Sequence, residues 1–202
     1  LWDALSNELW VGTTSVTALD RLITIFSDTF DRKFEMLAAG TQAFALSEVE
    51  NRTRQIDDAK PTAFVPSHTH EVAWVADETN RDFLGNEFLL WLWYYLEKES
   101  DAVGLHDGSE ATVMISKSLM LECPRGQTGR ETISSDGPSR LPETHRAIQA
   151  GKLPRRMGLI VVRQDEQYEL TIQAETLAIN GAKLPPVEGD EDRAPQQAEN
   201  RA

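Results

Sequence analysis

The amino-acid sequence predicts an α+β protein with mixed or antiparallel sheets and packed helices. Its first half places apolar residues at helical spacing, and its second half contains segments in which apolar and polar residues alternate as they do in strands. Between the two lies an almost unbroken aromatic and aliphatic run, residues 88–96. With 202 residues and 40% hydrophobic content, the chain is long enough for one substantial domain or two small ones.

Residues 1–60 are expected to form a first α/β subdomain. Apolar residues between positions 16 and 30 recur every three or four residues, which predicts an amphipathic helix that Ser15 can cap. The expected elements are a strand over 8–12, this helix over 15–30, a strand over 33–37 and a second helix over 41–51. Charged residues together with Pro61 and Pro66 indicate that residues 52–66 connect to the next subdomain.

The apolar run is expected to belong to a helix over about residues 80–98. Thr79 and Asp82 fit a capping box at its start, and charged residues resume after position 96. Nine apolar residues are too few to cross a bilayer, which needs roughly 18 to 20, so no membrane association is expected. A helix that is apolar on nearly every side is expected to be buried on nearly every side, inside its domain or against a neighbour. The candidates for core or interface positions are Phe88, Trp91, Trp93 and Tyr94.

A second subdomain, rich in strands, is expected over residues 67–184. The segment 158–162 and the segment 168–173 form the strongest hairpin candidate, with a turn at 164–166. The other expected elements are a strand over 72–76, a hairpin of 112–122 with 131–134, a helix over 139–150 and a strand over 178–183. Residues 185–202 are rich in Pro, Gln, Glu and Asp, which predicts a disordered acidic tail.

Charge is distributed unevenly along the chain. The net charge is -13, which taken whole opposes nonspecific binding to nucleic acid. Residues 117–163 nevertheless carry nine basic and four acidic residues. Arg and Lys groups there surround a predicted helix end, a tight turn and a strand start, from which they could reach consecutive phosphates. The alternative is a solvated surface on which cations offset the dipole at the helix C-terminus.

Enzyme chemistry finds little support. His68, His70 and Glu71 are the best metal-ligand candidates, because alternate residues of an extended segment point to one side. Two close histidines are a weak signal, and a structural or solvent-exposed role is simpler. Cys123 could act as a nucleophile with His145 only if folding brought them together, so a small core residue is the preferred interpretation.

Phosphate-loop chemistry is excluded by spacing. Gly151 and Lys152 lack the preceding glycine and the following Ser or Thr of a nucleotide-binding loop, because Arg146 and Leu153 occupy those positions. The carboxylates form no recognisable cluster for two-metal phosphodiester cleavage. The sequence therefore assigns no catalytic residue, no metal and no cofactor, and it predicts a protein that is not an enzyme. The single cysteine and the lack of a signal-peptide pattern predict a cytoplasmic setting.

The order of its motifs gives the chain a family resemblance. The segment DFLGNEFLLWLW at 82–93, a β-rich stretch, and a helix that ends in AGK at 150–152 resemble the divergent branch of the recombination-associated RdgC family. The likeness covers about residues 8–184 and rests on order and spacing. Members of this family carry a further N-terminal region, so the chain is expected to be a fragment of a longer protein.

The resemblance implies a function and a set of contacts. RdgC-like proteins form ring-shaped homodimers that enclose duplex DNA without sequence preference and restrain the RecA recombinase, which implies a nucleoid-associated protein. The residues expected to contact DNA are Arg146, Lys152, Arg155, Arg156 and Arg163. The alternatives are a protein-interaction scaffold that does not bind DNA and, as a weaker one, a metal-dependent hydrolase or exonuclease.

Overall fold

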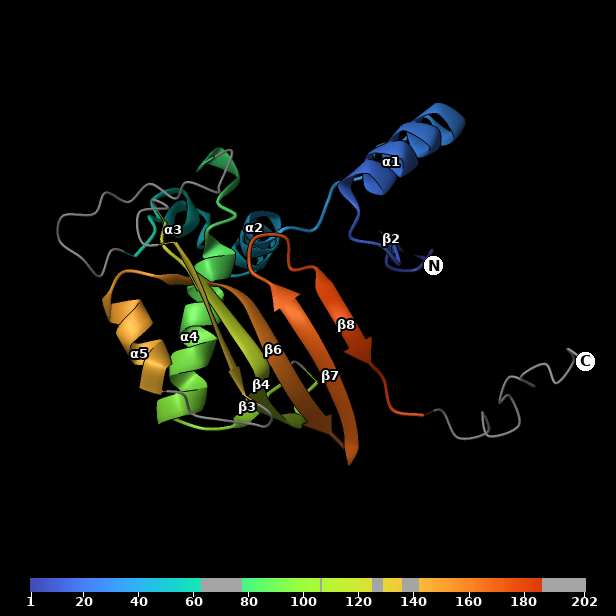
Figure 1. The fold of residues 1–202 in the computed structure, drawn as a ribbon. Coiled ribbons are helices and arrows are strands. Elements are labelled where there is room, and N and C mark those ends of the chain that lie inside the picture. The colour runs from blue at the N-terminus through green and yellow to red at the C-terminus, as the bar shows by residue number, and fades with distance from the viewer. Residues whose placement is uncertain (63–77, 106, 125–128, 136–141, 187–202) are drawn as a thin grey trace, which may run out of the picture.

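In the computed structural model, one sheet and the helices on one of its faces form the main body of the protein (Figure 1). The structure describes residues 1–62, 78–105, 107–124, 129–135 and 142–186. The helices are α1 (Val16–Phe30), α2 (Ala39–Val49), α3 (Thr53–Asp57), the 3-10 turn η1 (Glu78–Asn80), α4 (Leu84–Lys98) and α5 (Pro142–Gln149). The main-sheet strands are β3 (Ala102–Gly104), β4 (Glu110–Glu122), β5 (Arg130–Ser135), β6 (Leu153–Arg163), β7 (Glu166–Gln173) and β8 (Ile179–Lys183). The predicted α+β class is confirmed.

The main sheet is antiparallel throughout its described pairs, in the order β3-β4-β6-β7-β8. The long strand β4 pairs with β3 along its first part and with β5 along its last part, while β6 lies on its other side. β6 and β7 form the hairpin expected from their alternation, and Gln164 and Asp165 turn it with φ of 51° and 67°. Positive φ at both turn residues matches the right-handed twist of paired strands.

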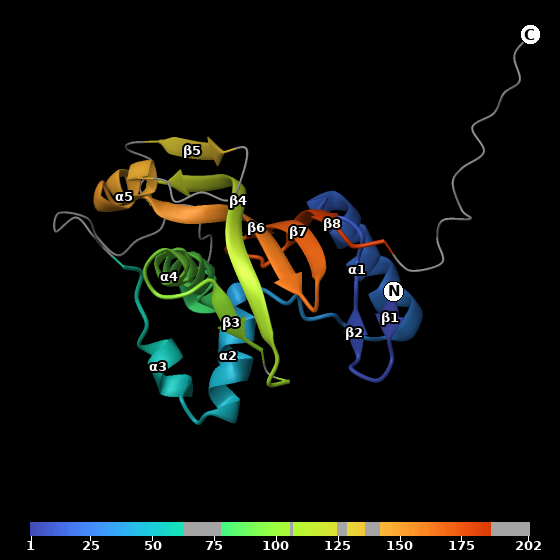
Figure 2. The same ribbon diagram turned by 90° about the horizontal axis from the view of Figure 1, so that it is seen from below.

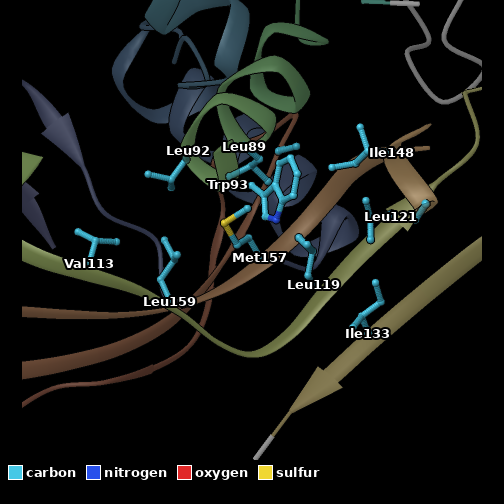
Figure 3. Packing of buried hydrophobic residues seen from close by; sticks show 12 residues of the cluster. Leu89, Leu92, Trp93, Val113, Leu119, Leu121, Ile133, Ile148, Met157 and Leu159 are labelled. Carbon is cyan, nitrogen blue, oxygen red and sulfur yellow. The ribbon is translucent and has the colours of Figure 1, made fainter. Parts of the chain in front are cut away.

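The core lies between the sheet and the layer formed by α4 and α5 (Figure 2). Figure 3 shows Leu89 and Trp93 pointing from α4 toward Met157 of β6. Burial of a large apolar side chain of this kind contributes about 1.5 to 3 kcal/mol. The other buried members of this cluster are Leu92, Val113, Leu119, Leu121, Ile133, Ala147, Ile148, Leu159 and Ala174. One continuous cluster therefore joins α4 and α5 to β4, β5 and β6 and to Ala174 just after β7.

Residues 1–37 pack largely on themselves. The short strands β1 (Trp2–Asp3) and β2 (Glu8–Leu9) form a hairpin, and both ribbon views place α1 apart from α4 and α5. The helix predicted over 15–30 is confirmed as α1, although Ser15 at its N-cap position makes no side-chain capping hydrogen bond. The strand predicted over 33–37 is wrong. Phe34 instead places its ring 4.1 Å from that of Phe26 on α1, so this segment packs against the helix without pairing in a sheet.

The start of α4 also differs from the prediction. Its N-cap position is Phe83, which makes no side-chain capping hydrogen bond, so the capping box of Thr79 and Asp82 is wrong. The Asp82 carboxylate instead accepts a hydrogen bond from the backbone N–H of Gly40 at 3.1 Å. This contact attaches the start of α2 to the start of α4. The helix predicted over 41–51 is confirmed as α2, and the helix predicted over 139–150 is confirmed over its described part as α5.

The other sequence predictions have different outcomes. The hairpin of β4 with β5 and the strand β8 are confirmed. The connection expected over 52–66 contains the short helix α3 within its described part. The strand expected over 72–76 and the histidine pair lie outside the described residues, as do residues 187–202 of the expected tail. The division near residue 60 stays a prediction, although Ala39 of α2 donates its N–H to the carbonyl of Glu175 at 2.9 Å.

Candidate functional site

The first turn of α4 lies directly against the segment between β7 and β8. Gly85 approaches that segment so closely that a Cβ atom built on it would lie 1.8 Å from the carbonyl oxygen of Ala174. The next residue, Asn86, is fully buried and donates its side-chain N–H groups to the carbonyl of Pro154 at 2.7 Å and to Oε1 of Glu175 at 3.0 Å. The Gly-Asn pair within the DFLGNEF segment therefore joins α4 to β6 and to the connection between β7 and β8.

Two of the five predicted DNA-contacting cations are held inside a network of carboxylates. Arg155 donates from Nε to Glu175 and from Nη1 to Glu122, each at 2.9 Å. Lys152 is buried, and its Nζ donates to Oε2 of Glu131 at 2.6 Å. The carboxylates reduce the positive potential that these side chains present to solvent, because opposite charges this close offset one another.

A third cation, Arg163, pairs with Asp107 at the C-terminal end of β6. Its Nη2 donates to Oδ2 of Asp107. Hydrogen bonds from the side chain and backbone of Ser109, together with the nearby Arg163 charge, lower the pKa of the Asp107 carboxyl from its ordinary value. The carboxylate therefore stays ionised at neutral pH and remains a partner for Arg163.

The remaining two cations, Arg146 and Arg156, are exposed on different sides of the molecule. Arg146 lies on α5, whose buried residues join the core cluster beside α4. Arg156 precedes the buried Met157 on β6, and successive side chains of a strand point to opposite faces. Arg156 thus lies on the sheet face opposite α4 and α5, where its Nη2 is 3.4 Å from Oε1 of Gln173. The five cations do not share one continuous face, and their assignment to DNA stays a prediction.

The outward side of α4 carries an exposed row of aromatic side chains. Its members, called the aromatic row below, are the exposed Phe88, Trp91 and Tyr94 and the half-buried Tyr95. Phe88 is 41% exposed, Trp91 51% and Tyr94 50%. Trp91 stacks on Phe88 with ring centroids 6.0 Å apart and on Tyr95 with centroids 5.3 Å apart, each at 27°.

The expectation that this helix is buried on nearly every side inside its own domain is therefore wrong within the described residues, and burial against a neighbour stays a prediction. Trp93 is a core residue, since it is only 6% exposed and sets its ring edge to face against that of His145 at 4.8 Å. Phe88, Trp91 and Tyr94 point away from the sheet. The physical reason is that α4 covers one sheet face as the outer layer, so only the side of the helix toward the sheet meets the core.

The residues considered for catalysis, His145 and Cys123, are poorly placed to react with a substrate. His145 contacts Oε1 of Glu97 through Nε2 at 2.7 Å, which ties α5 to the end of α4. Cys123 is fully buried, so its thiol is inaccessible to a substrate from solution. Within the described part of the chain, no group of three or more His, Cys, Asp or Glu residues could hold a metal ion. His68, His70 and Glu71 fall outside that part.

Comparison with known proteins leaves the family unassigned. No protein-family model, curated protein or solved structure matches the chain. Among the described residues, no helix is both long and apolar enough to span a membrane. What the fold and the site define is an α+β protein with a solvent-facing aromatic row and a carboxylate-bound cation cluster. The likeness to the RdgC family remains a resemblance of sequence order.

Proposed function

We propose that this chain is a non-enzymatic, RdgC-like protein of DNA recombination whose aromatic row is a contact surface for another protein. The observation that carries the proposal is the exposure of three large aromatic side chains, Phe88, Trp91 and Tyr94, on one helix. The resemblance in motif order supports the wider setting. There the protein would act on duplex DNA and, through that DNA, on access of the RecA recombinase.

The physical argument concerns the free energy of exposed aromatic surface. Aromatic residues supply much of the binding energy at protein interfaces, and contiguous exposed apolar patches often indicate interaction sites. The row is ordered before any partner arrives, because Trp91 is stacked between Phe88 and Tyr95 and the Tyr95 hydroxyl donates to the carbonyl of Ala102 at 3.0 Å. Such a preorganised surface loses little side-chain entropy on binding.

A second candidate function is direct, sequence-independent binding of duplex DNA by this chain. It is favoured by Arg156, an exposed cation on the sheet face that α4 and α5 leave open. Hydroxyl and amide side chains of the neighbouring strands can add phosphate contacts there. The charge of -13 opposes it, because the protein as a whole repels a polyanion.

The test of the contact surface uses phage-displayed random peptides. Peptides are selected on the wild-type protein, and their affinities are then measured on Trp91→Ala and on the control Trp10→Ala, which also removes an exposed indole. We expect peptides that lose about ten-fold or more in affinity on Trp91→Ala and remain unchanged on Trp10→Ala, since a central interface tryptophan contributes at least about 1.4 kcal/mol. Selected peptides that bind both variants equally would contradict the proposal, provided that circular dichroism shows both variants folded.

A further inference from the structure

We infer that the partner segment for the aromatic row is cationic, a peptide stretch that carries arginine or lysine side chains. This inference rests on the proposed function of the row as a protein-contact surface. It adds the chemistry of the partner, which follows from the ring geometry and from the charges around α4.

The ring geometry suits a guanidinium or ammonium group. Phe88, Trp91 and Tyr95 are stacked in series with interplanar angles of only 27°. Half of the Trp91 side chain nevertheless remains open to solvent. Because Phe88 and Tyr95 lie along the two faces of Trp91, a cation is attracted to the parts of the ring faces that the row leaves open, within about 6 Å of a ring centre.

Charges on and around α4 favour the same kind of partner. Residues 39–62 and 78–101, which hold α2, α3 and α4, contain ten acidic and five basic residues. Glu87 lies four residues before Trp91, so the two side chains are neighbours on the helix surface. Its carboxylate is held in place by hydrogen bonds from the backbone N–H of Thr62 at 2.6 Å and from the Thr62 hydroxyl at 2.7 Å.

The charges at the C-terminal end of the row are mixed, because Lys98 stands between Glu97 and Glu99. Lys98 lies on the outward side of α4 at its C-terminal end, where its Nζ is 3.3 Å from Oε1 of Glu97. The partner cation is therefore expected near Glu87 and Trp91, at the N-terminal end of the row. A nucleic acid strand could also stack its bases on such rings, but its phosphates would meet the acidic helix layer.

The experiment measures binding of three fluorescent probes by anisotropy at low salt. The probes are a 12-residue peptide with four arginines spaced by Pro and Gly, the same peptide with four glutamates, and a single-stranded dT12 oligonucleotide. We expect the arginine peptide to bind at least about ten-fold more tightly than either other probe. Trp91→Ala and Glu87→Gln are each expected to weaken it by about five-fold.

Two control variants separate the row from general attraction to an acidic protein. Trp10→Ala removes an exposed indole elsewhere, and Asp28→Asn removes one negative charge from exposed α1. Both are expected to leave the affinity for the arginine peptide within about two-fold of wild type, because neither residue is near α4. If these controls weaken binding as much as Trp91→Ala and Glu87→Gln do, the attraction is diffuse and the inference is overturned.

The remaining outcomes distinguish failure of this inference from failure of the proposed function. Binding of dT12 that exceeds peptide binding and is lost in Trp91→Ala would replace the cationic peptide with nucleic acid. Neutral selected peptides that need Trp91 would overturn the cationic partner and leave the contact surface intact.

The difference in acrylamide quenching between wild type and Trp91→Phe reports access to Trp91. If acrylamide fails to quench Trp91 at every protein concentration, the chain covers its own row. If quenching fails only at high protein concentration, a second copy covers the row. Either result overturns both proposals.

Discussion

At the scale of single residues, Arg155 and Arg156 show how two adjacent cations acquire different roles. Arg155 has a side chain only 17% exposed, and it bridges Glu122 of β4 and Glu175 beyond β7. Glu175 in turn accepts from Asn86 of α4. Arg156 lies on the opposite sheet face and is exposed. Removal of one member of a buried ion pair leaves the other charge without compensation, which costs more than the pair itself contributes.

This contrast gives a prediction on stability. Arg155→Ala should lower the free energy of unfolding by about 3 kcal/mol, because it leaves the carboxylates of Glu122 and Glu175 partly buried and unpaired. Arg156→Ala should change it by less than about 0.5 kcal/mol, as is usual for an exposed site. Urea denaturation followed by circular dichroism measures both. Equal midpoints for the two variants would show that Arg155 has no structural role.

At the scale of elements, α4 is the helix that organises the fold. Its inward side supplies Leu89, Leu92 and Trp93 to the core, and its first turn contacts the backbone of the β7–β8 connection through Gly85. The same helix carries the aromatic row on its outward side. Packing and the candidate contact surface thus share one rigid element, which favours precise placement of the row.

A substitution at Gly85 tests how closely α4 must approach the sheet. Gly85→Ala would place its Cβ 1.8 Å from the carbonyl oxygen of Ala174 and 2.9 Å from the Cβ of Ala39. Because backbone would have to shift, we expect a loss of about 3 kcal/mol or more in unfolding free energy. Gly104→Ala is the matched control, since a Cβ there meets nothing within 4 Å. A thermal midpoint for Gly85→Ala equal to that of the control would contradict the close approach.

At the scale of the whole molecule, the net charge and the positions of the exposed cations limit how the protein can bind a polyanion. The chain carries -13, and Lys152 and Arg155 in its positive segment are bound by carboxylates that come from β4, β5 and the segment after β7. The exposed Arg146 and Arg156 lie on different sides of the sheet, so a single straight duplex cannot contact both at once. Direct contact of a duplex with Arg146 or Arg156 at one site therefore involves few phosphates.

This arrangement limits the salt dependence that duplex binding can show. If Arg156 contacts a phosphate, Arg156→Ala should reduce the slope of log affinity against log salt by about 0.9, with similar losses on two unrelated duplexes. Arg146→Ala should then leave the slope unchanged. Arg54→Ala on α3 controls for the loss of one positive charge. The Arg54 side chain is 94% exposed, and Arg54 is far from Arg156 in the sequence. An unchanged slope for Arg156→Ala would remove this face from the DNA-binding candidates and favour the protein-contact function alone.

The elements predicted from local sequence were those whose patterns depend on near neighbours. The β6–β7 hairpin followed from alternation and a short polar turn, and α1 followed from apolar residues at helical spacing. The prediction of a strand over 33–37 was wrong because an apolar, strand-like composition does not indicate whether a partner strand is within reach. Phe34 instead packs against the ring of Phe26 on α1, and the segment pairs with no strand in the described part of the chain.

By itself, the sequence determined the fold class, most of the elements and the concentration of positive charge after residue 116, because each of these is a local or compositional property. Only the tertiary structure decided that Lys152 and Arg155 are paired with carboxylates and that Trp91 faces solvent while Trp93 faces the core. Asn86 and Glu175 are 89 positions apart in the chain, yet they share a hydrogen bond. The physical reason is that ion pairing and helix sidedness depend on which distant strands come together, and no periodicity within a single segment encodes that.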